Sequence, residues 1–189
     1  MPEPDTLALE PNGEIPNSVL PVLVYRATEL TDPAAAERTF AERDWRGAWR
    51  NGIFDFHHFH STAHEVLAIV AGKVTVRLGG PPPGGVALTA GRGDVLVLPA
   101  GTGHCRLEAS DDLLVVGAYP GGMEWDVCRG DPAEREMVTR NLAAVPLPST
   151  DPLHGADGAL PRVWAAAEAA GGRGRRDRFL NRSGPSSAR

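Results

Sequence analysis

The 189-residue sequence predicts an all-β domain with short flanking helices. From Gly52 onward, short runs rich in β-branched residues alternate with Gly and Pro turns, a pattern typical of sandwiches and barrels. No helical pattern separates these runs, which argues against a βαβ fold. The chain is long enough to bury a core without disulfides or structural metals, so we expect one domain.

Two elements are expected before Gly52. The run VLPVLVYRA (19–27) is apolar and β-branched, which is typical of a strand. The run DPAAAERTFAERDW (32–45) predicts a short helix, because Asp32 is a suitable N-cap and Pro33 stands at the first helical position.

Several β-rich runs follow, each bounded by turn residues: 53–60, 64–72, 73–80, 85–93, 94–101, 104–112 and 113–120. The pattern then loosens into loops, and PRVWAAAEAA (161–170) predicts a second short helix. We expect a flexible N-terminal tail, a flanking strand and helix, the β-rich core, a C-terminal extension and a disordered basic tail, at residues 1–16, 17–51, 52–120, 121–170 and 171–189.

Composition argues against several classes of function. The net charge of −5 disfavours a nucleic-acid partner, although the C-terminal tail is basic. The N-terminus lacks the pattern of a signal peptide, and no apolar run has the length of a membrane span. The two cysteines, Cys105 and Cys128, suggest no disulfide framework. We therefore expect a cytoplasmic protein with neither membrane nor nucleic acid as a partner.

Four of the six histidines lie in HHFHSTAH (57–64), directly before Glu65. Alternate residues of a strand point to the same side, so His58 and His60 share a face and His57 points away from it. The short turn after them lets Glu65 return beside the pair on the next strand. This spacing predicts a metal site, and the alternative is a solvated polar face.

A second segment, GDVLVLPAGTGHCRLE (93–108), offers a fourth ligand. Its strand ends at Pro99, and His104 begins the following strand after a Gly-rich turn. His104 would reach the site from a distant hairpin, as the interior of a barrel requires. Three imidazoles and one carboxylate suit Fe, Mn, Ni, Cu or Zn better than Ca or Mg.

These two segments resemble the two motifs of the cupins, a superfamily of small β-barrels. The first motif is met in full, by Gly52, His58, His60, Glu65 and Gly72. The second motif is matched by Gly93, Pro99, Gly101 and His104, while Glu108 replaces its usual Asn. Longer stretches, among them WRNGIFDFHHFHSTAHEVL and VPLPSTDPLHGADG, resemble the YjlB-like cupins, which are single-domain bacterial proteins.

The resemblance implies a single-domain cupin, that is, a small β-barrel or jelly roll. It also implies that one divalent transition metal ion is held by His58, His60, Glu65 and His104. It supplies no substrate.

Other residues are candidates for the surroundings of the metal. Phe54 and Phe56 share the ligand face and either line a pocket or belong to the core, and Tyr119 lies near a strand end. Arg106 either pairs with Glu108, binds an anionic substrate or reaches solvent. His64 either assists the neighbouring ligand as a proton shuttle or is a polar turn residue.

We expect a metal-dependent cupin that acts on a small molecule, with dioxygenase-type chemistry favoured over isomerase or decarboxylase chemistry. The alternative is a non-catalytic cupin that senses a metal or a small ligand. No DNA-binding domain is evident in the sequence, which favours the enzyme. The apolar residues Val66, Ala68 and Val70 predict a covered outer face and, with it, a homodimer.

Overall fold

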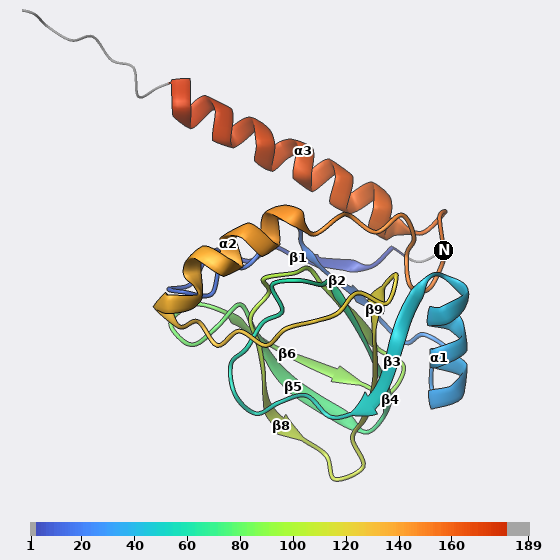
Figure 1. The fold of residues 1–189 in the computed structure, drawn as a ribbon. Helices are drawn as coiled ribbons and strands as arrows, with labels where there is room; N and C mark the ends of the chain where they lie inside the picture. The colour runs from blue at the N-terminus through green and yellow to red at the C-terminus, as the bar shows by residue number, and fades with distance from the viewer. Residues whose placement is uncertain (1–2, 181–189) are drawn as a thin grey trace, which may run out of the picture.

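The computed structural model describes residues 3–180 and contains two antiparallel sheets that face each other (Figure 1). In spatial order, the larger sheet contains β1 (Asp5–Leu7), β2 (Val22–Tyr25), β7 (Val95–Leu98), β4 (Glu65–Ala71), β9 (Leu114–Pro120) and β3 (Trp45–Asn51). The smaller sheet contains β6 (Val86–Gly91), β5 (Lys73–Leu78) and β8 (His104–Ala109). The all-β, jelly-roll prediction is confirmed, although the described strands form two sheets and not one closed barrel.

Strand β4 has apolar side chains on both faces, and both faces are covered. Leu67 and Ile69 lie in the core between the two sheets, together with residues of β5 and β7. Val66, Ala68 and Val70 lie in a second core on the other side of the larger sheet. That second core is completed by helices of the same chain, so the covered face that favoured a homodimer is explained within one protomer.

The helices pack on this outer side. Helix α1 (Pro33–Glu42) begins as predicted, with the Asp32 side chain accepting the backbone N–H of Ala35 at 2.8 Å. It buries Phe40 against the sheet. Helix α3 (Ala159–Leu180) buries Trp164 there, and the indole N–H donates to the Pro21 carbonyl at 2.9 Å.

The extent of α3 differs from the prediction. The short helix expected at 161–170 is present, but it continues to Leu180, into the region where we expected a disordered tail. The rest of that expected tail, 181–189, lies outside the described residues. Between Pro120 and α3 we expected only loops. This region instead contains the short 3-10 helix η1 (Pro132–Glu134), which is followed directly by helix α2 (Arg135–Ala144).

The N-terminal segment is also more ordered than expected. Residues 5–7 form β1, which pairs with β2. Ile15 is buried, and the Asn12 amide donates to the carbonyls of Gly79 and Pro81 at 3.1 and 2.8 Å. These contacts hold the N-terminal segment against the rest of the molecule, although its composition predicted a loose tail.

The strand predicted at 53–60 is wrong. This segment leaves the edge strand β3 of the larger sheet and reaches the edge strand β8 of the smaller one, so it has no continuous neighbour to pair with. It makes only isolated bridges, His58 with His104 and Phe59 with Cys128. Within residues 3–180, no helix is long and apolar enough to cross a membrane.

Candidate metal centre

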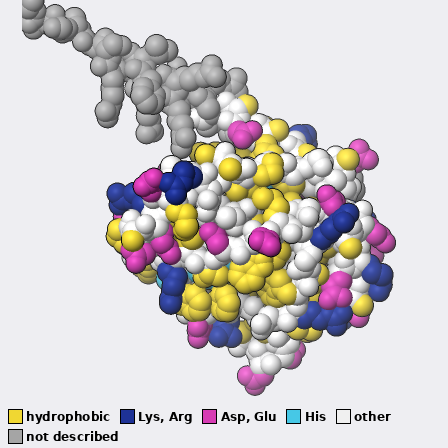
Figure 2. Space-filling view, viewed as in Figure 1, with side chains coloured by type: hydrophobic (Ala, Val, Ile, Leu, Met, Phe, Trp, Pro, Cys, Tyr) yellow, Lys and Arg dark blue, Asp and Glu magenta, His cyan; other side chains and the backbone are white. Residues whose placement is uncertain are grey.

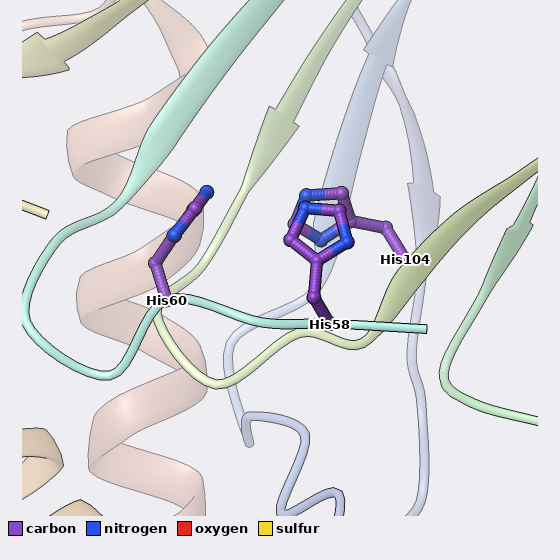
Figure 3. Close-up of side chains that lie close together, drawn as sticks. All are labelled: His58, His60 and His104. Atoms are coloured by element: carbon purple, nitrogen blue, oxygen red, sulfur yellow. The ribbon is translucent and has the colours of Figure 1, made fainter. Parts of the chain in front are cut away.

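Three buried histidines converge at one end of the space between the sheets (Figure 3). One ring nitrogen each from His58, His60 and His104 lies within 4.8 Å of the other two. Backbone pairing brings the first and last together, because the N–H of His104 donates to the His58 carbonyl at 2.8 Å and the N–H of His58 donates back at 3.1 Å. We call these three side chains the histidine cluster.

Each ring of the histidine cluster is held by a backbone carbonyl. The Nδ1 atoms of His58 and His104 lie 3.0 and 2.9 Å from the carbonyl oxygens of Phe56 and Thr102. The Nδ1 of His60 bonds the Asp126 carbonyl in the same way. A carbonyl only accepts, so each Nδ1 carries the hydrogen and each Nε2 presents its lone pair, which is the usual preparation of histidine for a metal.

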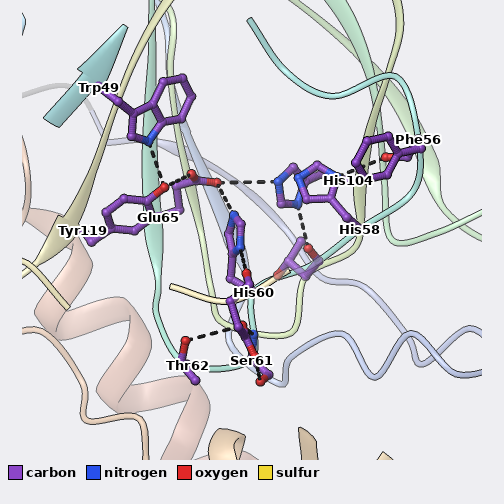
Figure 4. Close-up of polar contacts among 11 residues, drawn as sticks. Trp49, Phe56, His58, His60, Ser61, Thr62, Glu65, His104 and Tyr119 are labelled. Atoms are coloured by element: carbon purple, nitrogen blue, oxygen red, sulfur yellow. Dashed lines mark hydrogen bonds and ion pairs between the residues drawn. The ribbon is translucent and has the colours of Figure 1, made fainter. Parts of the chain in front are cut away.

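Glu65 completes the set from β4 (Figure 4). Its Oε2 lies 3.4 Å from His60 Nε2 and 3.5 Å from His104 Nε2, with all three side chains buried. Burial opposes the charge on Glu65, but the neighbouring imidazoles outweigh it and lower the pKa of the carboxyl. The carboxylate therefore stays ionised in the interior of the protein.

The arrangement fits a cation. The Nε2 atoms of His60 and His104 face a carboxylate oxygen of Glu65 at distances too long for a good hydrogen bond. Burial lowers the pKa of His104 to about 3, so this imidazole is neutral at physiological pH. Burial also opposes charge on His60, but Glu65 outweighs it and raises the pKa of that imidazole. Three converging imidazoles and one carboxylate form a donor set suited to a divalent transition metal.

A hydrogen-bonded chain orients the carboxylate. The Tyr119 hydroxyl donates to Glu65 Oε1 at 3.0 Å, and the Trp49 indole N–H donates to the Tyr119 oxygen at 2.8 Å. Oε1 is thereby occupied, and Oε2 is left for the histidine cluster. Gly117 makes room for this chain, since a Cβ there would lie 2.2 Å from the Trp49 ring.

A second set of contacts fixes the loop that carries His60. The Asp126 carboxylate accepts from the backbone N–H of Ser61 at 2.6 Å and from its hydroxyl. The Asn141 amide of α2 donates to the same hydroxyl at 2.8 Å. Through its carbonyl and its carboxylate, Asp126 therefore contacts both His60 and the next residue.

A cavity of about 290 Å³ opens beside the histidine cluster. Among its lining residues are the three histidines, Glu65, Phe54 and Tyr119 of the predicted set, together with Trp49, Arg50, Leu67 and Trp125. Figure 2 shows scarcely any histidine colour on the face it draws, in keeping with the burial of the cluster.

The other pocket candidates lie outside this lining. Phe56 stacks on Phe54, one ring away from the cavity. Arg106 lies 3.6 Å from the carboxylate of Asp55 at the surface, so it reaches the rim and pairs with a residue other than Glu108, whose side chain is exposed.

The structure places His64 away from the histidine cluster. Its ring lies 4.7 Å from that of Trp164 of α3, and its Nδ1 accepts the backbone N–H of Ala100 at 2.9 Å. Burial lowers its pKa to about 4, so the ring is neutral. His64 thus packs on the outer side of the larger sheet, against α3, and does not face the histidine cluster. His57, which strand alternation predicted to point away from His58 and His60, is absent from both the histidine cluster and the cavity lining.

Comparison with known proteins identifies the chain. It is 37% identical over 163 residues to a protein of Bacillus subtilis (strain 168) named "Uncharacterized protein YjlB", covering 86% of this chain and 97% of that one. The chain belongs to the YjlB family. Both sequence motifs, the facing sheets and the histidine cluster confirm that this YjlB-family protein is a cupin. No protein-family model matches it.

Solved structures similar to this YjlB-family chain are distant. Acireductone dioxygenase from Bacillus anthracis is 20% identical with a TM-score of 0.34, over 46% of this chain and 56% of that one. Oxalate decarboxylase OxdC of Bacillus subtilis is 17% identical with a TM-score of 0.37, over 58% and 28%. A DUF861 protein from Thermotoga maritima is 20% identical with a TM-score of 0.34, over 51% and 96%. The chain therefore spans less than two thirds of the first two.

Sequence reasoning predicted the four side chains that the structure brings together, but it missed the contacts that orient them. Trp49, Asp126 and Ser61 act through contacts with segments far along the chain, which no local spacing reveals. Gly117 was the one sequence indication of such a contact, because a glycine inside a strand often marks the close approach of another group, here the Trp49 ring.

Proposed function

We propose that this cupin is a metal-dependent enzyme that acts on a small molecule, with dioxygenase-type chemistry favoured over isomerase or decarboxylase chemistry. The observation that carries the proposal is the set of nitrogen and oxygen lone pairs that converge beside an open cavity. His58, His60, Glu65 and His104 would hold the ion. A transition metal in such a site supplies O2 activation or the polarisation of a substrate carbonyl.

The chain's own residues have separate tasks in this proposal. Three backbone carbonyls keep the imidazoles in the Nδ1–H form. Tyr119 and Trp49 hold Glu65 in one orientation. Leu67 and the aromatic side chains give the cavity in which the substrate would bind a largely apolar lining.

Metal binding is tested by elemental analysis. Protein purified without chelators and supplied with Fe, Mn, Ni, Cu or Zn should contain about one ion per chain, and His60→Ala should lose most of it. His154→Ala is the matched control, because this histidine lies against Tyr25 outside the site. Wild-type protein without metal after this treatment would refute the proposal.

Catalysis is tested by oxygen uptake. Fe(II)-loaded protein is mixed with a panel of small metabolites in an oxygen electrode, with His60→Ala as the control. Uptake that depends on both the metabolite and His60 supports the dioxygenase. Metal-loaded protein that binds a metabolite without O2 consumption or product favours the alternative, a non-catalytic sensor.

Two expectations accompany the proposal. From the sequence we expect a cytoplasmic location. The homodimer also stays a prediction, although the apolar face that suggested it is covered by the protein's own helices. Light scattering separates the chain mass of 20.0 kDa from twice that value.

A further inference from the structure

Two aromatic walls border the histidine cluster. In the first wall, Trp125 stacks on Tyr119 with ring centroids 5.9 Å apart and planes 21° from parallel, and Trp125 stands edge-on to His60 at 5.3 Å. In the second wall, Phe54 stacks on Phe56 with ring centroids 4.9 Å apart and planes 16° from parallel. Phe54 also stands edge-on to His58, with ring centroids 5.0 Å apart. Each wall thus touches a different ligand residue.

The outermost ring of each wall is only half covered. Trp125 and Phe54 are each 45% exposed, although both line the cavity. Figure 2 shows hydrophobic side chains gathered over the segments that lie between β3 and β8 in Figure 1. Large exposed aromatic rings beside a cavity offer stacking area to a ligand.

The cavity has no free cation among its lining residues. Its charged lining side chains are Glu65 and Arg50. The Arg50 guanidinium is occupied by Glu37, with two hydrogen bonds of 2.6 and 2.7 Å. A ligand with a second acidic group would therefore find no partner for it in the lining, and burying an unpaired charge is costly.

The size of the cavity also limits the ligand. At about 290 Å³ it lies at the lower end of the range for small-molecule sites. One ring with a short polar group fits this space.

We propose that the ligand of this site is a single flat, unsaturated ring with at most one negative charge, stacked on Trp125 and Phe54 with its oxygen atoms toward the histidine cluster. This inference rests on the proposed function, because it names the substrate class of the same site. The two walls supply the stacking area, and the histidine cluster defines which end of the molecule is polar.

The probes are matched carboxylates on protein loaded with Zn(II), which allows binding without oxidation. Benzoate and cyclohexanecarboxylate carry the same charge and the same oxygen atoms, but only benzoate is flat. Calorimetry should show benzoate binding about threefold to tenfold more tightly, as expected from aromatic stacking. Isophthalate adds a second carboxylate to the same ring and should bind more weakly than benzoate.

Variants test the walls directly. Trp125→Ala and Phe54→Ala should each weaken benzoate binding by about threefold to tenfold, and both should reduce the preference over cyclohexanecarboxylate. Trp125→Phe should restore part of the loss. Leu107→Ala is the control, since Leu107 is equally exposed at 45% but lies outside the cavity lining.

The outcomes separate this inference from the proposed function. The zinc content of each sample is measured first, and a protein without zinc refutes the metal site. If zinc is present but the two matched carboxylates bind equally, or isophthalate binds most tightly, the substrate class is wrong. Unchanged benzoate binding in both alanine variants also overturns it.

Discussion

At the scale of single residues, the site is held by groups that do not belong to the ligand set. The backbone carbonyls of Phe56, Thr102 and Asp126 decide which nitrogen of each imidazole is free. Asp126 contributes twice, because its carboxylate also fixes Ser61, the residue after His60. Residues that orient a ligand commonly affect metal affinity almost as strongly as the ligand itself.

Replacing Asp126 should therefore weaken metal binding. Asp126→Ala removes the acceptor for the Ser61 backbone and hydroxyl, which loosens the loop that carries His60. We expect an affinity about tenfold to 100-fold lower in a competition titration with a metal-sensitive dye. Asp111→Ala, at an exposed turn, should bind metal as the wild type does. Equal affinity in the two variants would contradict the assigned role.

At the scale of elements, the sheet that presents Glu65 depends on the helices behind it. Trp164 of α3 is fully buried against β-strand residues and against His64. Trp164→Ala should cost about 3–5 kcal/mol of unfolding free energy, because it removes a large buried ring. Urea denaturation measures this loss, with Met137→Ala on the exposed face of α2 as the control. A loss no larger than that of the control would show that α3 does not support the sheet.

The turn between β6 and β7 predicts a dependence of stability on pH. Burial opposes ionisation of Asp94, but the N–H groups of Gly91 and Ala27 and the guanidinium of Arg26 outweigh it and lower the pKa of the carboxyl. A pKa lowered by folding stabilises the protein above the unfolded value, and this stabilisation is lost as the pH falls through the folded value.

Asp94→Asn should therefore be less stable than the wild type by about 1–2 kcal/mol at pH 7. The difference should shrink as the pH falls below about 4, where the carboxyl of the unfolded chain takes up a proton, and it should be smallest below the lower pKa of the folded state. Urea midpoints across the pH range give the measurement. A difference that stays constant down to acidic pH would mean that the charge of Asp94 does not contribute.

Sequence patterns predicted the strands with regular alternation and missed elements held by distant contacts. Strand β4 was evident because, after Glu65, its two faces are both apolar over the remaining six residues. Residues 53–60 were predicted to form a strand with alternating faces and do not, yet His58 and His60 still face inward. The isolated bridges at His58 and Phe59 keep the backbone extended there, so alternate side chains, His58 and His60, still point to the same side. Strand β1, with three residues, gave no pattern to read.

At the scale of the whole molecule, the site joins the two sheets. His104 comes from the smaller sheet and Glu65 from the larger one, while His58 and His60 lie on the segment that passes between them. An ion bound by all of them would therefore add cross-links to the folded state alone. A ligand that binds only the native state raises its stability by mass action.

Metal should accordingly raise the melting temperature. At free metal about 100 times the Kd, the gain is about 2.7 kcal/mol, which corresponds to roughly 5–10 °C for a chain of this size. Scanning calorimetry with metal and with excess chelator gives the comparison. His60→Ala should show a much smaller shift, and an equal shift in that variant would place the stabilising ion elsewhere.

The position of His104, far along the chain from His58 and His60, has a kinetic consequence. Strand β8, which begins at His104, must pair with the earlier segment before any ion meets its full set of ligands, and contacts between distant parts of a chain form slowly. Capture of an ion by the full set would thus be a late event of folding. In a refolding experiment, the time course of capture by the full set would report when these two segments of the chain meet.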